Sequence, residues 1–185
     1  MDHTKYSERR IWLVKDVSLL DENEVQGLMT LIKKISDLMR PVAQQAGTPL
    51  QIGFLQGLKG KGKVYIIGHG SPSTVGDLTP HEMAYQLVSR GGLQSGSTVR
   101  LVSCNTAFSK WVFWEDSYAK KLKKELAKRG ADCEVVGQAG IATLTPTGSI
   151  RTMRVYEWGP HPKNPARQIP VQSTTLGKGV GKRRY

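Results

Sequence analysis

Two short apolar runs, each followed at once by a residue with reactive chemistry, constrain most strongly what this chain can fold into. Val64–Ile67 leads into Gly-His69-Gly, and Val99–Val102 leads into Ser-Cys104-Asn. Runs rich in β-branched residues are typical of strands that are buried on both faces of a parallel sheet. Functional groups in open α/β sheets lie just past the carboxyl ends of such strands. We therefore expect His69 and Cys104 to lie at the same edge of one sheet.

The rest of the chain predicts an α/β domain over residues 11–158. Apolar residues spaced by three and four predict a helix over about 24–45, and Thr79-Pro-His-Glu has the form of a capping box that begins a second helix. Further strands are expected at 11–14, 51–55 and 133–136, a third helix at about 116–129, and a β-hairpin at 141–144 and 150–156. These elements predict a three-layer sandwich, with a mostly parallel sheet flanked by helices and a hairpin near its carboxyl-terminal end.

The charge of the chain indicates an anionic partner. Its 185 residues carry a formal net charge of +12, which suits a nucleic acid, an anionic membrane or a phosphorylated small molecule. No apolar run approaches the length of a membrane span. Residues 1–10 contain no apolar signal-peptide core, and because they are mostly polar we expect them to form a flexible N-terminus. Residues 159–185 are basic and rich in Pro and Gly, and we expect a solvated tail. Two cysteines make no disulfide framework and favour a reduced compartment.

The order strand–His-Gly, helix, strand–Cys resembles the caspase-like clan of cysteine peptidases. It is most similar to the self-processing cysteine protease domains of large bacterial toxins, which share an Ile-Gly-His69-Gly strand end and a helix opening like Leu-Thr79-Pro-His-Glu-Met-Ala. The resemblance extends over roughly residues 52–156 and includes the hairpin. It departs at Ser-Cys104-Asn-Thr, because the toxin domains usually have Gly before the cysteine and Ser after it. That variant is more similar to CHAT-type members of the same clan.

The resemblance implies a cysteine endopeptidase of a toxin or effector that acts on itself or on a host protein. We expect it in the cytoplasm or, alternatively, secreted or delivered into a host cell by a non-classical route. Cys104 would be the nucleophile and His69 the acid/base, with the N–H groups of Gly70 and Cys104 as an oxyanion hole. The chemistry is sound without the family, because a thiol needs a nearby base to form its thiolate and a leaving amine needs a proton. The alternative is that His69 is a strand-end histidine and Cys104 a small buried side chain.

Other residues support more limited expectations. Ser103, Trp111 and Trp114 could line a substrate pocket, although the two tryptophans could equally cover the core. The toxin domains are activated by inositol hexakisphosphate, and the basic residues that could bind such a polyanion here are Lys59, Lys61, Lys63, Arg151 and Arg154. We expect the lysines between 120 and 128 to form a solvated helix face, and Cys133 to be a buried structural thiol. The Cys and His residues show no metal-ligand spacing, so no metal is expected.

Two other functions remain open at this stage. The chain could be a catalytically silent caspase-like module that binds a polyanion or a protein partner, in which case Cys104 would show no special reactivity. It could also be a basic nucleic-acid-binding protein with an incidental cysteine. The second is the less favoured, because the sequence contains no recognition motif for nucleic acid.

Overall fold

A six-stranded sheet forms the centre of the computed structural model, which describes residues 9–14, 22–39, 43–44, 49–58, 62–107, 116–161, 164–175 and 182–185. Its strands are β1 (Arg9–Leu13), β2 (Ala43–Gln44), β3 (Lys63–Ile67), β4 (Thr98–Val102), β5 (Glu134–Gln138) and β9 (Lys182–Arg184). They lie in the order β2-β1-β3-β4-β5-β9, and only the β5–β9 pair is antiparallel. The prediction of a mostly parallel α/β sheet is confirmed.

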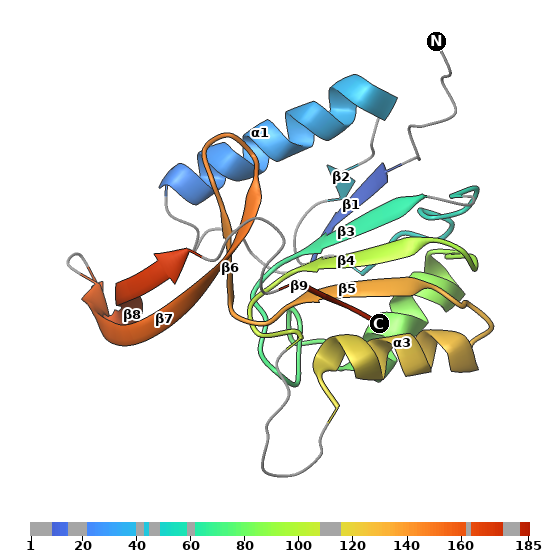
Figure 1. Cartoon of the computed structure of the whole chain (residues 1–185). Coiled ribbons are helices and arrows are strands. Elements are labelled where there is room, and N and C mark those ends of the chain that lie inside the picture. Colours follow the sequence, from blue (N-terminus) through green and yellow to red (C-terminus); the bar gives the residue numbers. More distant parts are fainter. Residues whose placement is uncertain are drawn as a thin grey trace.

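Helices cover both faces of this sheet (Figure 1). α1 (Glu22–Met39) lies on one face, and α2 (Pro80–Ala84), the π-helix η2 (Tyr85–Arg90) and α3 (Tyr118–Lys128) lie on the other. The alternation of side chains along each strand explains the two layers. Val64 and Ile66 of β3 belong to the apolar cluster shared with α2 and α3, whereas Tyr65 and Ile67 belong to the cluster shared with α1.

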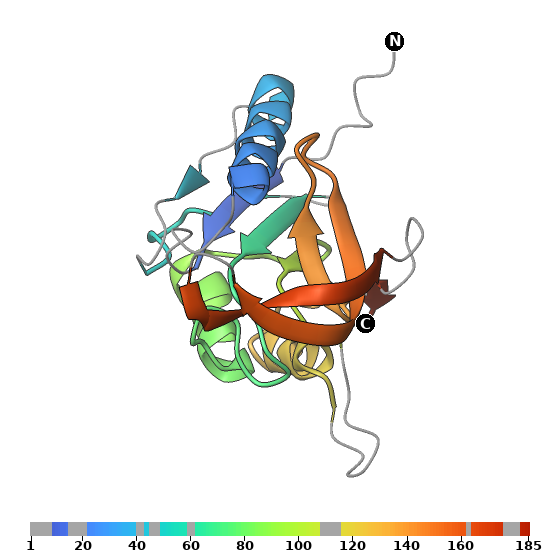
Figure 2. The ribbon, with the colours of Figure 1, turned by 90° about the vertical axis from the view of Figure 1, so that its left-hand side faces the viewer.

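A second, antiparallel sheet lies beyond the carboxyl ends of the central strands (Figures 1 and 2). Its strands β6 (Ile141–Leu144), β7 (Ile150–His161) and β8 (Asn164–Thr175) are ordered β6-β7-β8. The predicted hairpin is therefore confirmed as β6 and β7, although β7 is longer than expected. The hairpin tip touches α1: a Cβ added to Gly148, whose φ is +72°, would lie 2.8 Å from the backbone nitrogen of Leu31.

The expectation of a solvated tail after residue 158 is wrong for the residues that the structure describes. Residues 159–161 complete β7, residues 164–175 form β8, and residues 182–184 form β9 against β5. The composition misled because Pro and Gly are frequent there, yet Pro is tolerated in an edge strand such as β8. Alternation in Gln168-Ile-Pro-Val-Gln was a signal for a strand.

Three smaller expectations also need correction. Residues 52–57 form turns and not a strand, with the N–H of Gln56 bonded to the carbonyl of Gly53. α1 ends at Met39, before Pro41, because the residue that precedes a proline is disfavoured in the helical region. Its buried residues include Leu28 and Leu31, whereas Val25, whose spacing of three from Leu28 predicts a place on the same buried stripe, is 43% exposed.

Candidate active site

The parallel pairing of β3 with β4 brings the two reactive strand ends level with each other. Ile67 is the register partner of Val102, and these are the last paired residues of their strands. His69 and Cys104 each follow two residues later, so they occupy matching positions just beyond the sheet. The prediction that the fold brings these two strand ends to one edge is confirmed.

Gly70 makes the close approach between the two strand ends possible. A Cβ added to Gly70 would lie 2.7 Å from the Cβ of Ser103, 2.8 Å from the carbonyl oxygen of Cys104 and 3.1 Å from its backbone nitrogen. No side chain other than hydrogen fits in that space. Within the described part of the chain, the N–H of Gly70 donates no hydrogen bond. The backbone of Gly70 thus lies against that of Cys104, and the N–H of Gly70 has no acceptor among the described residues.

The segment after His69 folds into a short, internally bonded loop. The carbonyl of His69 accepts from the N–H of Gly76 at 2.8 Å, and the hydroxyl of Ser71 accepts from the N–H of Thr74 at 3.0 Å. These bonds hold the backbone of the loop that begins at His69. Its side chain is exposed, and among the described residues no hydrogen bond partner of the imidazole is found. The imidazole is therefore accessible to a molecule lying across the strand ends.

The turn formed by residues 104–107, here called the cysteine turn, is held from several sides. Asn105 adopts a left-handed conformation with φ of +55°, and its N–H donates to the carbonyl of Gly140 at 2.8 Å. The fully buried hydroxyl of Thr106 donates to the carbonyl of Ser103 at 3.2 Å and accepts from the N–H of Gln138 at 3.0 Å. Cys104 itself is partly exposed. Cys104 is thus a partly exposed residue on a turn whose backbone is held by hydrogen bonds to residues 138 and 140.

The end of β5 packs against the cysteine turn and forms hydrogen bonds with it. The N–H of Ala107 donates to the carbonyl of Gln138 at 2.8 Å, and a Cβ on Gly137 would lie 3.1 Å from that same nitrogen. The side chain of Gln138 is buried and accepts from the hydroxyl of Thr152 in β7 at 2.5 Å. The cysteine turn is therefore linked through Gln138 to the second sheet.

Sequence reasoning missed Thr106, Gly137 and Gln138 as supporting residues. Their contacts depend on how the end of β5 meets the residues after β4, which no local pattern specifies. The only local signal was the hydroxyl residue two positions after the cysteine. Thr and Ser at such positions commonly bond to nearby backbone groups.

The other predicted site residues are spread over the molecule. Ser103 is buried, and its hydroxyl has no hydrogen bond partner among the described residues. Lys63 begins β3, so it lies at the end of the strand opposite to His69, whereas Arg151 and Arg154 are exposed on β7 (Figure 1). The structure does not bring Lys63 together with these arginines. The remaining predicted residues, Lys59, Lys61, Trp111 and Trp114, lie outside the described residues.

Cys133 differs from Cys104 in its surroundings. It is 2% exposed, and its thiol donates to the carbonyl of Gln94 at 3.4 Å. Burial raises the pKa of the Cys133 thiol from 9.0 to about 11, because the charged thiolate is poorly solvated there. The prediction that this cysteine is buried is confirmed.

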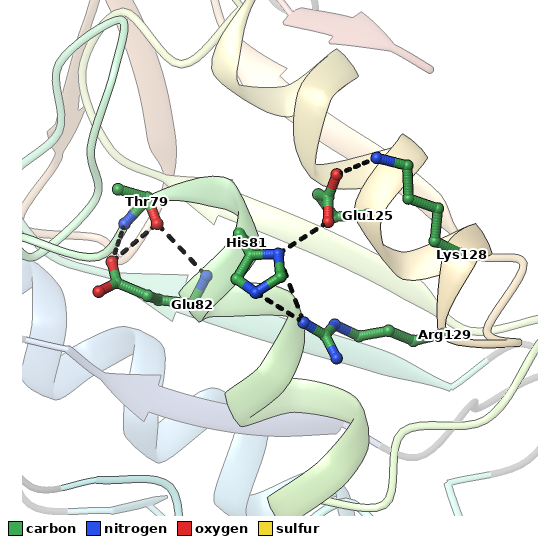
Figure 3. Close-up of polar contacts among 6 residues, drawn as sticks. All are labelled: Thr79, His81, Glu82, Glu125, Lys128 and Arg129. Atoms are coloured by element: carbon green, nitrogen blue, oxygen red, sulfur yellow. Dashed lines mark hydrogen bonds and ion pairs between the residues drawn. The ribbon is translucent and has the colours of Figure 1, made fainter.

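A polar cluster joins α2 to α3 (Figure 3). Nδ1 of His81 lies 3.1 Å from a carboxylate oxygen of Glu125, and its Nε2 lies 3.1 Å from the guanidinium of Arg129. Hydrogen bonds from Lys128 and then His81 lower the pKa of Glu125. Bonds from the backbone and hydroxyl of Thr79 likewise lower the pKa of Glu82, which confirms the predicted capping box.

The expected exposed lysine face of α3 is confirmed for Lys120, Lys124 and Lys128, whereas Lys121 and Lys123 are only partly exposed. Lys120 and Lys124 both bond to Asp116, and Lys128 bonds to Glu125, with 50–69% of these lysine side chains exposed. Across the described ranges, no group of three or more His, Cys, Asp or Glu side chains is placed to hold a metal ion. No described helix combines the length and the apolar composition that crossing a membrane would require.

Comparison with known proteins gives a family but no activity. A protein-family model described as "Domain of unknown function (DUF8616)" matches residues 39–152. This match covers more than half of the chain and includes β3, β4 and the residues that follow each of them. No curated protein matches the sequence.

Proposed function

The chain belongs to the DUF8616 family, and we propose that this member is a cysteine endopeptidase with Cys104 as nucleophile and His69 as acid/base. The observation that carries the proposal is the matched position of the two residues beyond β3 and β4, with Gly70 against the backbone of Cys104. A thiol and an imidazole at one sheet edge, beside a backbone donor, are the parts that acyl transfer needs.

In the first half of the reaction, the thiolate of Cys104 attacks the carbonyl carbon of the scissile peptide bond. Negative charge moves to the carbonyl oxygen, and the N–H groups of Gly70 and Cys104 stabilise it. His69, as imidazolium, gives a proton to the leaving amine, and the C–N bond breaks. The products of this half are a free amine and a thioester on Cys104.

In the second half, His69 removes a proton from water as the oxygen attacks the thioester carbonyl. The C–S bond breaks, the acid product leaves and the thiolate returns. His69 contacts the substrate and water in both halves, so the scheme does not need a direct bond between imidazole and thiol. This agrees with an exposed imidazole that has no hydrogen bond to Cys104 in the described structure.

The finer parts of the proposal rest on the resemblance to the caspase-like clan. The order strand–His-Gly, helix, strand–Cys, helix, strand, hairpin is the one that the resemblance implies, and the elements β3 to β7 follow it. We extend the proposal to a toxin or effector setting, to processing of the chain itself or of a partner protein, and to activation by a polyphosphate. The exposed arginines 151 and 154 on β7 are its best-placed candidates for that ligand.

A second candidate is a catalytically silent module of the same fold that binds a polyanion or a protein. The lack of a hydrogen bond between the His69 imidazole and Cys104 is equally compatible with this candidate, because an inactive site needs no such contact. The net charge of +12 supplies the binding energy for an anion.

Intact-mass spectrometry of the purified protein separates the two candidates. Wild type, Cys104→Ala, His69→Ala and Cys133→Ala are each incubated with a peptidyl epoxide, with and without inositol hexakisphosphate. We expect a covalent adduct or a cleavage product in wild type and in Cys133→Ala, none in Cys104→Ala, and a slower reaction in His69→Ala.

Dependence of the adduct on inositol hexakisphosphate would support activation by a polyphosphate, and an adduct without it would contradict that part alone. If no condition gives cleavage and Cys104 reacts no faster than Cys133, the endopeptidase proposal fails. The silent module is then the better description, and binding of the polyphosphate is measured directly by calorimetry.

A further inference from the structure

We infer that Tyr185 is a positioning residue for the cysteine turn, acting through its phenolic hydroxyl and through the pairing of β9 with β5. Its effect on catalysis rests on the proposed peptidase function, whereas its effect on the turn does not. The residue is far from Cys104 in the sequence and was no part of the predicted site.

The backbone of Tyr185 is bonded to β5 in both directions. Its N–H donates to the carbonyl of Val135 at 3.0 Å, and the N–H of Val135 donates to its carbonyl at 3.2 Å. Preceding it, Arg184 is the partner of Val136 and Lys182 is the partner of Gln138. Residues 182–185 thus lie along residues 135–138 of β5, which end at Gln138, the residue that holds the cysteine turn.

The side chain of Tyr185 reaches the turn itself. It packs against the main apolar cluster, and its hydroxyl donates to the carbonyl of Ala107 at 3.4 Å. Gly137 has no side chain, so Ala107 can lie directly against β5, where a Cβ on Gly137 would be 3.1 Å from the Cβ of Ala107. The missing side chain lets the turn lie close to the strand that Tyr185 pairs with.

Ala107 is consequently held at both of its backbone polar groups. Its N–H donates to Gln138 and its carbonyl accepts from Tyr185. Ala107 itself is fully buried, whereas the hydrogen bond from Tyr185 is partly buried. Loss of the phenolic hydroxyl would leave the Ala107 carbonyl without that donor. The Ala107 end of the cysteine turn would then be held less firmly.

Amide hydrogen exchange measured by NMR on Tyr185→Phe tests this inference. Phe keeps the ring that packs on the core and removes only the hydroxyl. We expect the amides of Asn105 and Ala107 to exchange about three- to tenfold faster, which is the effect that one net hydrogen bond supports, while the melting temperature changes little. Arg183→Ala is the matched control, because Arg183 lies in the same strand with an exposed side chain.

A peptide substrate gives the second readout, with kcat falling by a similar factor in Tyr185→Phe and KM unchanged. Unchanged exchange at Asn105 and Ala107 in Tyr185→Phe overturns the inference, as does an equal change in Arg183→Ala. If wild type shows no peptidase activity, the proposed function fails and exchange alone decides the role of Tyr185. If wild type is active and Tyr185→Phe matches it in both readouts, only the inference fails.

Discussion

Gly70 lies directly against Ser103, so closely that a Cβ on the glycine would be 2.7 Å from the Cβ of the serine. The contact joins the loop that carries His69 to the strand that carries Cys104. It follows from the parallel register of β3 and β4, in which Ile67 and Val102 are partners. A side-chain atom added at Gly70 must therefore displace the backbone of Cys104.

Gly70→Ala is expected to disturb the site more than the fold. The added methyl group meets the backbone of Cys104 as well as Ser103, and overpacking of this kind costs about 1–3 kcal/mol. We expect a lower melting temperature and a loss of at least tenfold in the alkylation rate of Cys104. Peptide mapping after treatment with iodoacetamide measures that rate.

Gly130→Ala is the control for the cost of replacing a glycine. Gly130 has a φ of +81°, and a Cβ there would meet no atom within 4 Å. The variant should lose about 1 kcal/mol through backbone strain and keep the alkylation rate of Cys104. An equal loss of rate in both variants would show that Cys104 reports only general stability.

Thr106→Val should loosen the cysteine turn, and Thr106→Ser should preserve it. Valine has nearly the same shape as threonine but removes the buried hydroxyl that bridges the carbonyl of Ser103 and the N–H of Gln138. Leaving such groups unpaired costs about 1–3 kcal/mol. Urea unfolding of both variants measures the difference, and equal stability of the two would refute a structural role for the hydroxyl.

The sequence was sufficient to place His69 and Cys104 at one sheet edge because each follows a short run that is rich in buried, β-branched residues, although Arg100 interrupts the second run. Such a run indicates a strand without knowledge of its neighbours, and the end of the run marks the functional edge. The capping box at Thr79 was predictable for a similar reason, since both of its residues lie within one turn.

Long-range pairing explains what could not be predicted. β9 contains three residues, Lys182–Arg184, and only its partner β5 makes it a strand. The support that Gln138 gives to Thr106 depends on the registration of two segments that are distant in sequence. The basic residues 63, 151 and 154 were grouped by charge, yet the fold separates Lys63 from the other two.

The beginning of α3 should respond to acid. Bonds from Lys120 and then Lys124 lower the pKa of Asp116 from 3.8 to about 2. Because this pKa is lowered on folding, the stabilising contribution is complete above pH 3.8 and is lost as the pH falls through about 2. Amide protection factors in the first turn of α3, which correct for the intrinsic pH dependence of exchange, should fall over that range in wild type and should show no such fall in Asp116→Asn.

Cys133 should remain unmodified under conditions in which Cys104 reacts. With its pKa raised to about 11 by burial, only about one Cys133 side chain in a thousand is a thiolate at pH 8. Iodoacetamide should therefore label Cys133 at pH 8 only after unfolding, and labelling of the folded protein should begin as the pH approaches 11. Because this pKa is raised on folding, its stabilising contribution is complete below pH 9.0 and is lost as the pH rises through about 11. Cys133→Ala should remove that loss of stability in alkali, which urea unfolding at pH 8 and pH 10.5 would measure. Rapid labelling of Cys133 in the folded protein at pH 8 would contradict its burial.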